Sequence, residues 1–146
     1  MGGIWPATRS IATGRRYTRA GMDHADPAHP LRLLVDGRDV AAVRVATTRR
    51  ARARGLLGRP PPDGALLFPR TSSVHGVGMR FALDVALCTA PLDVVALAVL
   101  QPGGLVLPRR RVRAVLEAPV GSFAHWGLQV GSQLSLGVPA AFRAGR

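Results

Sequence analysis

Apolar residues occupy alternate positions over residues 31–35, and a second alternating run covers 40–45. A period of two is typical of β-strands, in which successive side chains point to opposite faces. Asp36-Gly37 separates the two runs and is a strong signal for a two-residue turn. The pattern therefore predicts a β-hairpin, with Ala41, Val43 and Val45 on one face of its second strand.

Further short apolar runs predict strands over 65–68, 83–87, 94–100, 105–107 and 133–136. Those over 83–87 and 94–100 are apolar enough that we expect both to be buried on both faces. Pro102-Gly103-Gly104 predicts a hairpin turn after which 105–107 continues as a strand.

Two short helices are predicted. Thr47-Thr48 offers a hydroxyl cap for a helix that runs through Leu57 and ends at Gly58. The second helix begins at Ser122 and ends at Gly127, with Phe123 and Trp126 on one side. The first two turns of the first helix are crowded with arginines, namely Arg49, Arg50, Arg52 and Arg54. A solvated basic face is the favoured interpretation, and a bound anion is the functional alternative.

Many short strands with two short helices predict a β-rich α+β fold, a small twisted or partly closed antiparallel β-barrel-like domain over residues 31–138. A chain of 146 residues has the length of one domain and can bury a substantial core. Residues 1–30, rich in Arg and without an acid before Asp23, are expected to form a disordered extension. Residues 139–146 are expected to form a loose tail.

The formal net charge is +12, and all 20 basic residues are Arg. The absence of Lys and the abundance of Ala, Gly and Pro are typical of a GC-rich genome, which weakens an inference from charge to nucleic acid. Arginine runs such as 109–113 still offer phosphate contacts. Few aromatic residues are present for base stacking, and no helix-turn-helix pattern occurs.

Several classes of protein are disfavoured by the sequence. No apolar run approaches the roughly 18 residues of a membrane-spanning helix, and no apolar stretch follows the N-terminal arginines, so we expect a cytoplasmic protein without a membrane span. The single cysteine, Cys88, cannot form an internal disulfide, and we expect it to be buried. Glycine patterns for nucleotides and cysteine pairs for zinc do not occur, so no cofactor or metal is expected. His75, Met79 and Cys88 would suit copper, but nothing in the sequence brings them together.

The segment 73–84 concentrates potential chemistry, because it holds His75, Arg80 and Asp84. Glu117 is the only Glu of the chain and lies in an apolar run, where an unpaired carboxylate would be costly. A structural ion pair of Glu117 with Arg54 or Arg80 is favoured over a catalytic role. Asp84 and Glu117 would suit glycosidase-type acid/base chemistry only at a carboxyl separation that chain spacing does not specify.

Four separated blocks together resemble the family called domain of unknown function 192, in its actinobacterial form. They are Arg54-Gly55-Leu56-Leu57-Gly58; Val74-His75 with Gly78-Met79-Arg80-Phe81 and Asp84-Val85; Val115-Leu116-Glu117-Ala118; and Gly121 with Trp126-Gly127-Leu128 and Gly131. The resemblance covers roughly residues 40–136 and implies one compact, mostly β domain of unestablished function, with no catalytic residues to carry over. This chain departs from the family pattern at Arg49-Arg50, Gly76-Val77, Cys88 and Ser132.

The leading hypothesis is a binding domain for an anionic or polar ligand, or for a partner protein, with its site edged by Arg54, His75, Arg80 and Glu117 and with Asp84 as a further candidate. A hydrolase or lyase that uses His75 with a carboxylate is the first alternative. Nucleic-acid binding through the arginine runs is the second. The sequence leaves the oligomeric state open.

Overall fold

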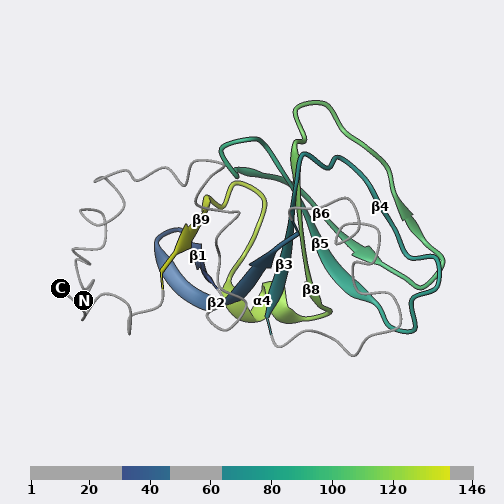
Figure 1. The fold of residues 1–146 in the computed structure, drawn as a ribbon, viewed down its shortest axis with the longest axis horizontal. Coiled ribbons are helices and arrows are strands. Elements are labelled where there is room, and N and C mark those ends of the chain that lie inside the picture. Colours follow the sequence, from purple (N-terminus) through teal and green to yellow (C-terminus); the bar gives the residue numbers. More distant parts are fainter. Residues whose placement is uncertain (1–30, 47–63, 139–146) are drawn as a thin grey trace.

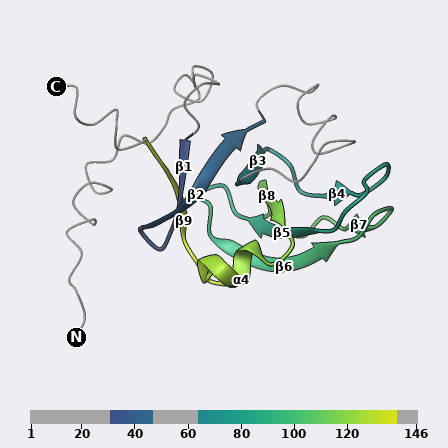
Figure 2. The same cartoon turned by 90° about the horizontal axis from the view of Figure 1, so that it is seen from below.

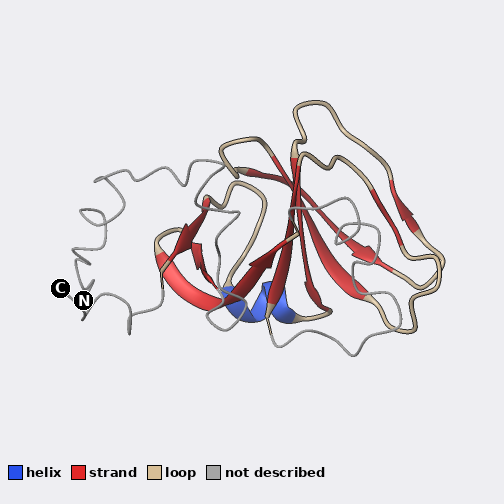
Figure 3. Cartoon of the chain, in the orientation of Figure 1, coloured by secondary structure: helices blue, strands red, loops and turns tan. Residues whose placement is uncertain are grey.

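The structure is a computed structural model that describes residues 31–46 and 64–138. In this part of the chain one short helix accompanies the strands (Figure 3). The elements are β1 (Leu31–Val35), β2 (Arg38–Val45), β3 (Ala65–Pro69), β4 (Val74–His75), β5 (Leu83–Cys88), β6 (Val94–Leu100), β7 (Leu105–Val106), β8 (Ala114–Pro119), α4 (Ser122–Trp126) and β9 (Leu134–Gly137). The predicted helix over 47–57, the extension over 1–30 and the tail over 139–146 lie outside the described residues. No helix in the described ranges has the length and apolar character to cross a membrane.

Seven strands form one sheet in the order β6-β5-β8-β3-β2-β1-β9. The sheet curls into a half-barrel, with β9, β1 and β2 on one side and β5 and β6 on the other (Figures 1 and 2). The prediction of a β-rich, partly closed fold is confirmed. Its antiparallel character is wrong at one place, since β2 and β3 pair in parallel. The long connection from 46 to 64 allows this crossover, which a hairpin turn would not.

Within the described residues, backbone bonds join the two sides of the curl at one end. Asp93 and Gln133 form an isolated bridge, and the Val94 N–H donates to the Ser132 carbonyl at 2.9 Å. These contacts link the start of β6 to the start of β9. No strand within the described ranges pairs with the outer edge of β6 beyond this point.

The predicted hairpin of β1 and β2 is confirmed. Its turn residues Asp36 and Gly37 have positive φ values of 49° and 82°, which match the type I′ turn that an Asp-Gly pair favours. Leu31, Leu33 and Val35 are all buried, as their alternation predicts. The hairpin therefore supplies one wall of the curl.

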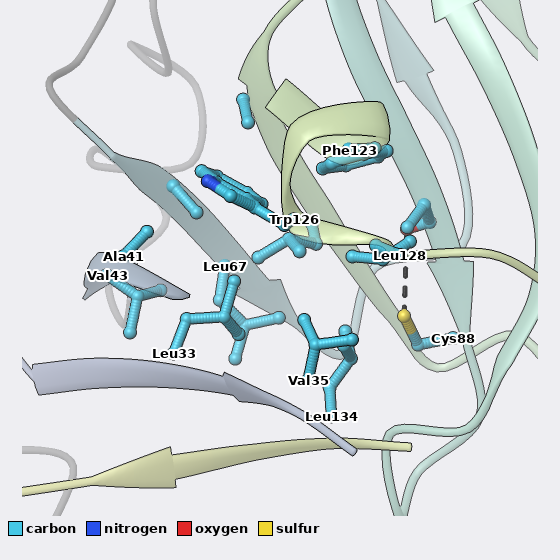
Figure 4. Close-up of a cluster of buried hydrophobic side chains, with 14 of the residues drawn as sticks. Leu33, Val35, Ala41, Val43, Leu67, Cys88, Phe123, Trp126, Leu128 and Leu134 are labelled. Carbon is cyan, nitrogen blue, oxygen red and sulfur yellow. Dashed lines mark hydrogen bonds between the residues drawn. The ribbon is translucent and has the colours of Figure 1, made fainter. Parts of the chain in front are cut away.

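One cluster of buried apolar side chains fills the concave side of the curl, where α4 lies (Figures 2 and 4). Phe123 and Trp126 project from α4 into this cluster, with ring centroids 5.9 Å apart. The helix begins and ends where the sequence predicts, and Gly127 closes it in the left-handed conformation with φ 66°. Arg38 donates to the Trp126 carbonyl at 3.0 Å, a favourable position for a cation at a helix C-terminus.

A second buried cluster lies on the other side of the sheet. Strand β5 divides its side chains between the two, with Leu83, Val85 and Leu87 in the second cluster and Ala86 and Cys88 in the first. All six residues of β5 are buried, as predicted. This strand is therefore the shared wall between the two parts of the core.

Strand β6 differs from the prediction, because only one of its faces is buried. Val95, Leu97 and Val99 are 38%, 38% and 51% exposed. The apolar composition of the run suggested burial on both faces, but β6 is an edge strand and nothing in the described structure covers its second face.

Strands β4 and β7 form a separate two-stranded sheet at the end of the molecule away from β9 (Figures 1 and 2). The prediction that the turn at Pro102-Gly103-Gly104 builds a hairpin with the preceding strand is wrong, since β7 pairs with β4. The reason lies in Gly76, whose N–H donates to Gly104 at 2.8 Å and whose carbonyl accepts from Gly103 at 2.7 Å. A Cβ on Gly76 would lie 2.3 Å from the Gln101 carbonyl oxygen. Gly76 thus permits two chain segments, and not a ligand, to approach closely.

Candidate functional site

The two acidic candidates lie on opposite faces of the main sheet. Asp84 pairs with Ala118 across β5 and β8, and the next pair is Val85 with Glu117. Directly opposite residues share a face and neighbouring residues alternate, so the two carboxyls point away from each other through the sheet. Asp84 and Glu117 therefore do not present the facing carboxylates that glycosidase-type chemistry needs.

Asp84 has a structural role on the concave side. It is 8% exposed, and its Oδ2 accepts the Phe123 N–H at 3.0 Å. The preceding Gly121 brings no side-chain cap to α4. Asp84 thus satisfies a free N–H at the start of the helix from a distant strand, where a negative charge is also favoured by the helix dipole.

Glu117 is 5% exposed on the side of the second cluster, with Leu66 and Val85 as its cross-strand neighbours. Burial raises the pKa of its carboxyl to about 7, because the charged form loses its hydration. Arg80 is exposed and forms no ion pair with Glu117 in the described structure. The other predicted partner, Arg54, lies outside the described residues.

His75 and Arg80 are both exposed and belong to the small sheet and the turn that follows it. His75 pairs with Leu105 on the outer face, while Val74 and Val106 pair on the inner face and pack against the second cluster. Val77, Leu105 and Leu107 are 63%, 63% and 66% exposed. We call His75, Val77, Arg80, Leu105 and Leu107 the β4–β7 surface. It combines large apolar side chains with a guanidinium and an imidazole in open solvent.

The arrangement does not assemble an acid/base pair around His75. The main sheet lies between the small sheet and the concave side, where Asp84 is bonded to α4. No ion pair joins His75 to a carboxylate among the residues that the structure describes. His75 is consequently exposed, without a carboxylate partner for general base catalysis among the residues described.

The potential soft metal ligands are also kept apart. Cys88 is fully buried in the concave cluster, Met79 packs against the second cluster, and His75 is exposed. Within residues 31–46 and 64–138, no group of three His, Cys, Asp or Glu side chains could hold a metal ion. Burial, with a smaller contribution from Asp93, raises the pKa of the Cys88 thiol to about 12. The predicted burial of Cys88 is confirmed, and the raised pKa disfavours the thiolate that thiol reactions require.

A wide, open hollow of about 330 Å³ lies elsewhere, lined by Arg32, Gly64, Ser122 and Trp126 among others. None of the candidate residues predicted from the sequence contributes to it. Arg32 is already held by Asp39 at 2.8 Å, so this hollow offers little unpaired chemistry among the residues described.

Comparison with known proteins identifies the architecture. The model of the DUF192 family, described as "Uncharacterized ACR", matches residues 32–136. A UPF0127 protein of Pyrococcus furiosus is 36% identical over 63 residues, which are 43% of this chain and 54% of that protein. The match thus spans about half the length of this curated relative.

Two solved structures are similar in fold. A protein of unknown function from Novosphingobium aromaticivorans DSM 12444 has a TM-score of 0.63 and 24% identity, covering 81% of this chain and 98% of its own. A putative transcription regulator from Sinorhizobium meliloti 1021 has a TM-score of 0.61 and 21% identity, covering 74% of this chain and 92% of its own. At these identities the similarity concerns the fold alone.

Proposed function

The chain belongs to the DUF192 family of uncharacterised domains. We propose that it is a binding domain whose β4–β7 surface recognises an acidic, partly apolar segment of a partner protein. The observation that carries the proposal is the exposure of Val77, Leu105 and Leu107 on the β4–β7 pair and its flanking residues, where Leu105 lies opposite His75 and Arg80 follows in the chain. Exposed apolar side chains gathered in one place are typical of interaction sites, and Arg is enriched in protein interfaces.

The charge of the chain supports an acidic partner. The net charge is +12, and Arg109, Arg110, Arg111 and Arg113 are exposed on the segment that follows β7. A partner with carboxylates would be attracted by this positive charge, and its apolar side chains would leave water by packing against Leu105 and Leu107.

The backbone of this surface is held in place before binding. The bonds between Gly76 and the turn at Gly103-Gly104 fix β4 against β7, and Val74 and Val106 anchor the pair on the second cluster. A surface that is ordered in advance loses less entropy when a partner binds.

A protein partner is favoured over nucleic acid by the kind of side chain that is exposed. The large exposed apolar side chains of the described residues are Val and Leu, while Phe123 and Trp126 are buried in the core. Bases stack most strongly on the rings of Phe, Tyr and Trp, and none of these belongs to the β4–β7 surface. The alternative of a hydrolase or lyase has no support from the positions of His75 and the two buried carboxylates.

The proposal is tested by selecting random displayed peptides on the immobilised protein. We expect selected peptides to be enriched in acidic and apolar residues, and to bind Arg80→Ala and Leu105→Ser about tenfold more weakly, which corresponds to about 1.4 kcal/mol. Arg44→Ala and Val130→Ser are matched controls, because both residues are exposed outside the β4–β7 surface. Peptides without acidic enrichment, or peptides that bind all variants equally, would contradict the proposal.

Two other ligand classes are tested with the same variants in separate binding measurements. Thermal stabilisation by phosphorylated sugars that depends on Arg80 would assign the surface to a small anionic ligand. Binding of single-stranded DNA with a steep salt dependence would assign it to nucleic acid. Either result in place of peptide binding would overturn the protein-partner proposal.

A further inference from the structure

We propose that two copies of this chain associate through antiparallel pairing of their β6 strands about a two-fold axis at Leu97. The proposal rests on three observations, namely an open strand edge, an exposed apolar row on that strand, and a palindromic order of its residues. It concerns a surface distinct from the β4–β7 surface and does not depend on the function proposed above.

Strand β6 is the last strand on its side of the main sheet. At Val94 its outer edge is occupied, because the Val94 N–H bonds to Ser132 and its carbonyl accepts from Gly131. From Val95 to Leu100 no strand of the described residues pairs with the outer edge. The backbone groups along such an edge are a template for another strand.

This edge lacks most of the features by which soluble proteins prevent pairing. Edge strands are usually protected by charged residues, prolines or bulges along the strand. β6 reads VVALAVL and contains neither charge nor proline. Its one irregularity is a bulge near its start: Leu87 faces Ala96 and Cys88 faces Val94, so Val95 has no direct partner in β5. From Ala96 to Leu100 the strand pairs with β5 in regular register.

The exposed face of β6 presents Val95, Leu97 and Val99, which are 38%, 38% and 51% exposed. Neighbouring Ala96 and Ala98 point to the second cluster instead. Pairing with another strand would cover the edge and bring new apolar neighbours to the exposed row, since side chains directly opposite in an antiparallel pair are in contact.

The order of residues in β6 indicates that the strand pairing with its outer edge comes from a second copy of this chain. The sequence Val95-Ala96-Leu97-Ala98-Val99 is the same in both directions. With a two-fold axis at Leu97, Val95 lies opposite Val99 of the partner subunit, and Leu97 lies opposite Leu97 of the partner subunit. All large side chains then meet on one face, and Ala96 meets Ala98 of the partner subunit on the other. A two-fold interface must be complementary to itself. Residues 95–99 meet this condition because their order is the same in both directions.

Charge does not oppose the pairing locally. The net charge of +12 disfavours association in general, but β6 is uncharged along its length, so no like charges meet across the pair. Added salt should strengthen the dimer, because it screens the general repulsion and leaves apolar contacts in place.

Analytical ultracentrifugation over a range of protein concentrations tests the proposal. We expect the full chain and Leu105→Lys to show a monomer–dimer equilibrium, and Leu97→Lys to weaken it at least tenfold. Val99→Lys is a second charged substitution on the same row. Both sites are exposed, so the fold tolerates the lysine, as circular dichroism would verify.

Three results would overturn the proposal: a monomer at all concentrations, dimers that both β6 variants form as strongly as the unmodified chain, or open-ended assembly beyond the dimer. Leu105→Lys changes the β4–β7 surface and leaves β6 unchanged. Failure of peptide binding and failure of dimerisation are therefore separable outcomes.

Discussion

Strands β5 and β6 are neighbours that pair from Leu83 with Leu100 to Cys88 with Val94, yet they meet solvent very differently. All of β5 is buried between the two clusters, whereas alternate residues of β6 are exposed. Both strands are apolar in composition, so composition does not account for the difference. Position in the sheet does, because β5 has a strand on each side, whereas among the described residues β6 is paired on one side only beyond Val94. An apolar strand at an edge therefore points to an interface.

The largest expected effect is a difference in stability between truncating a leucine of β5 and truncating a leucine of β6. Leu87→Ala in β5 removes a side chain that is 1% exposed and should lower the free energy of unfolding by about 2–5 kcal/mol. Leu97→Ala in β6 should cost less than about 1 kcal/mol in the monomer, since its side chain is already partly in water. Urea denaturation at low protein concentration measures both. Equal losses would contradict the assignment of β6 as an exposed edge.

A second prediction concerns Glu117, which is buried beside β5. Its pKa is raised above the unfolded value, from 4.5 to about 7, so the folded state binds its proton more tightly than the unfolded state. The free energy of unfolding should therefore fall by about 3 kcal/mol as the pH rises from about 4.5 to well above 7.

Glu117→Gln should remove this part of the pH dependence, as urea denaturation at several pH values would show. The variant has no ionisable group at position 117, so its curve isolates the contribution of the carboxyl. A contribution of opposite sign, with stability gained as the pH rises, would contradict burial as the dominant cause and support the predicted ion pair with Arg54.

A third prediction concerns the buried carboxylate of β5 itself. Asp84→Ala leaves the Phe123 N–H without its acceptor and should cost about 1–3 kcal/mol. Asp84→Asn retains a carbonyl oxygen and should cost less, which separates the hydrogen bond from the charge. The cross-strand partner of Asp84 in β6, Val99, offers a control, because Val99→Ala truncates a side chain that is 51% exposed and accepts no hydrogen bond. If all three variants unfolded at the same urea concentration, the proposed role of Asp84 at α4 would be wrong.

The smallest perturbation of the protein is a comparison of labelling rates between a thiol on β5 and a thiol on β6. Cys88 in β5 is fully buried and its pKa is about 12, so it should react with a thiol reagent only as fast as the protein unfolds. A thiol introduced by Val99→Cys in β6 should react at once in the monomer. Rapid labelling of Cys88 in the native protein would contradict its placement in the concave cluster.

Local signals predicted much of this fold. The Asp36-Gly37 turn, the alternation over 31–35 and the limits of α4 at Ser122 and Gly127 depend on neighbouring residues, and the structure confirms them. The sequence predictions that were wrong concern features that depend on the order of strands in the sheets. The pairing of β7 with β4, the parallel pairing of β2 with β3 and the exposure of β6 arise from contacts between distant segments.

The candidate site shows the same limit. The sequence suggested a polar cluster of residues 73–84 with Glu117. Asp84 and Glu117 nevertheless occupy opposite faces of the sheet, because their positions in the pairing of β5 with β8 differ by one residue. Sequence reasoning also missed the row formed by Val95, Leu97 and Val99. The palindromic order of residues 95–99 was visible in the sequence, although its meaning depends on β6 being an edge.

Cysteine cross-linking tests the register of the β6 pair most directly, because the buried Cys88 contributes little background. Leu97→Cys lies on the proposed axis, where opposing Cα atoms are about 4.5–5.5 Å apart and a disulfide can form. Val95→Cys alone would face its own copy at about 13 Å and should not cross-link, whereas a mixture of Val95→Cys and Val99→Cys should. Cross-linking of Leu97→Cys and of the mixture, but of neither single variant at the flanks, is the predicted result. Equal cross-linking at all three positions, or none at Leu97→Cys, would contradict it.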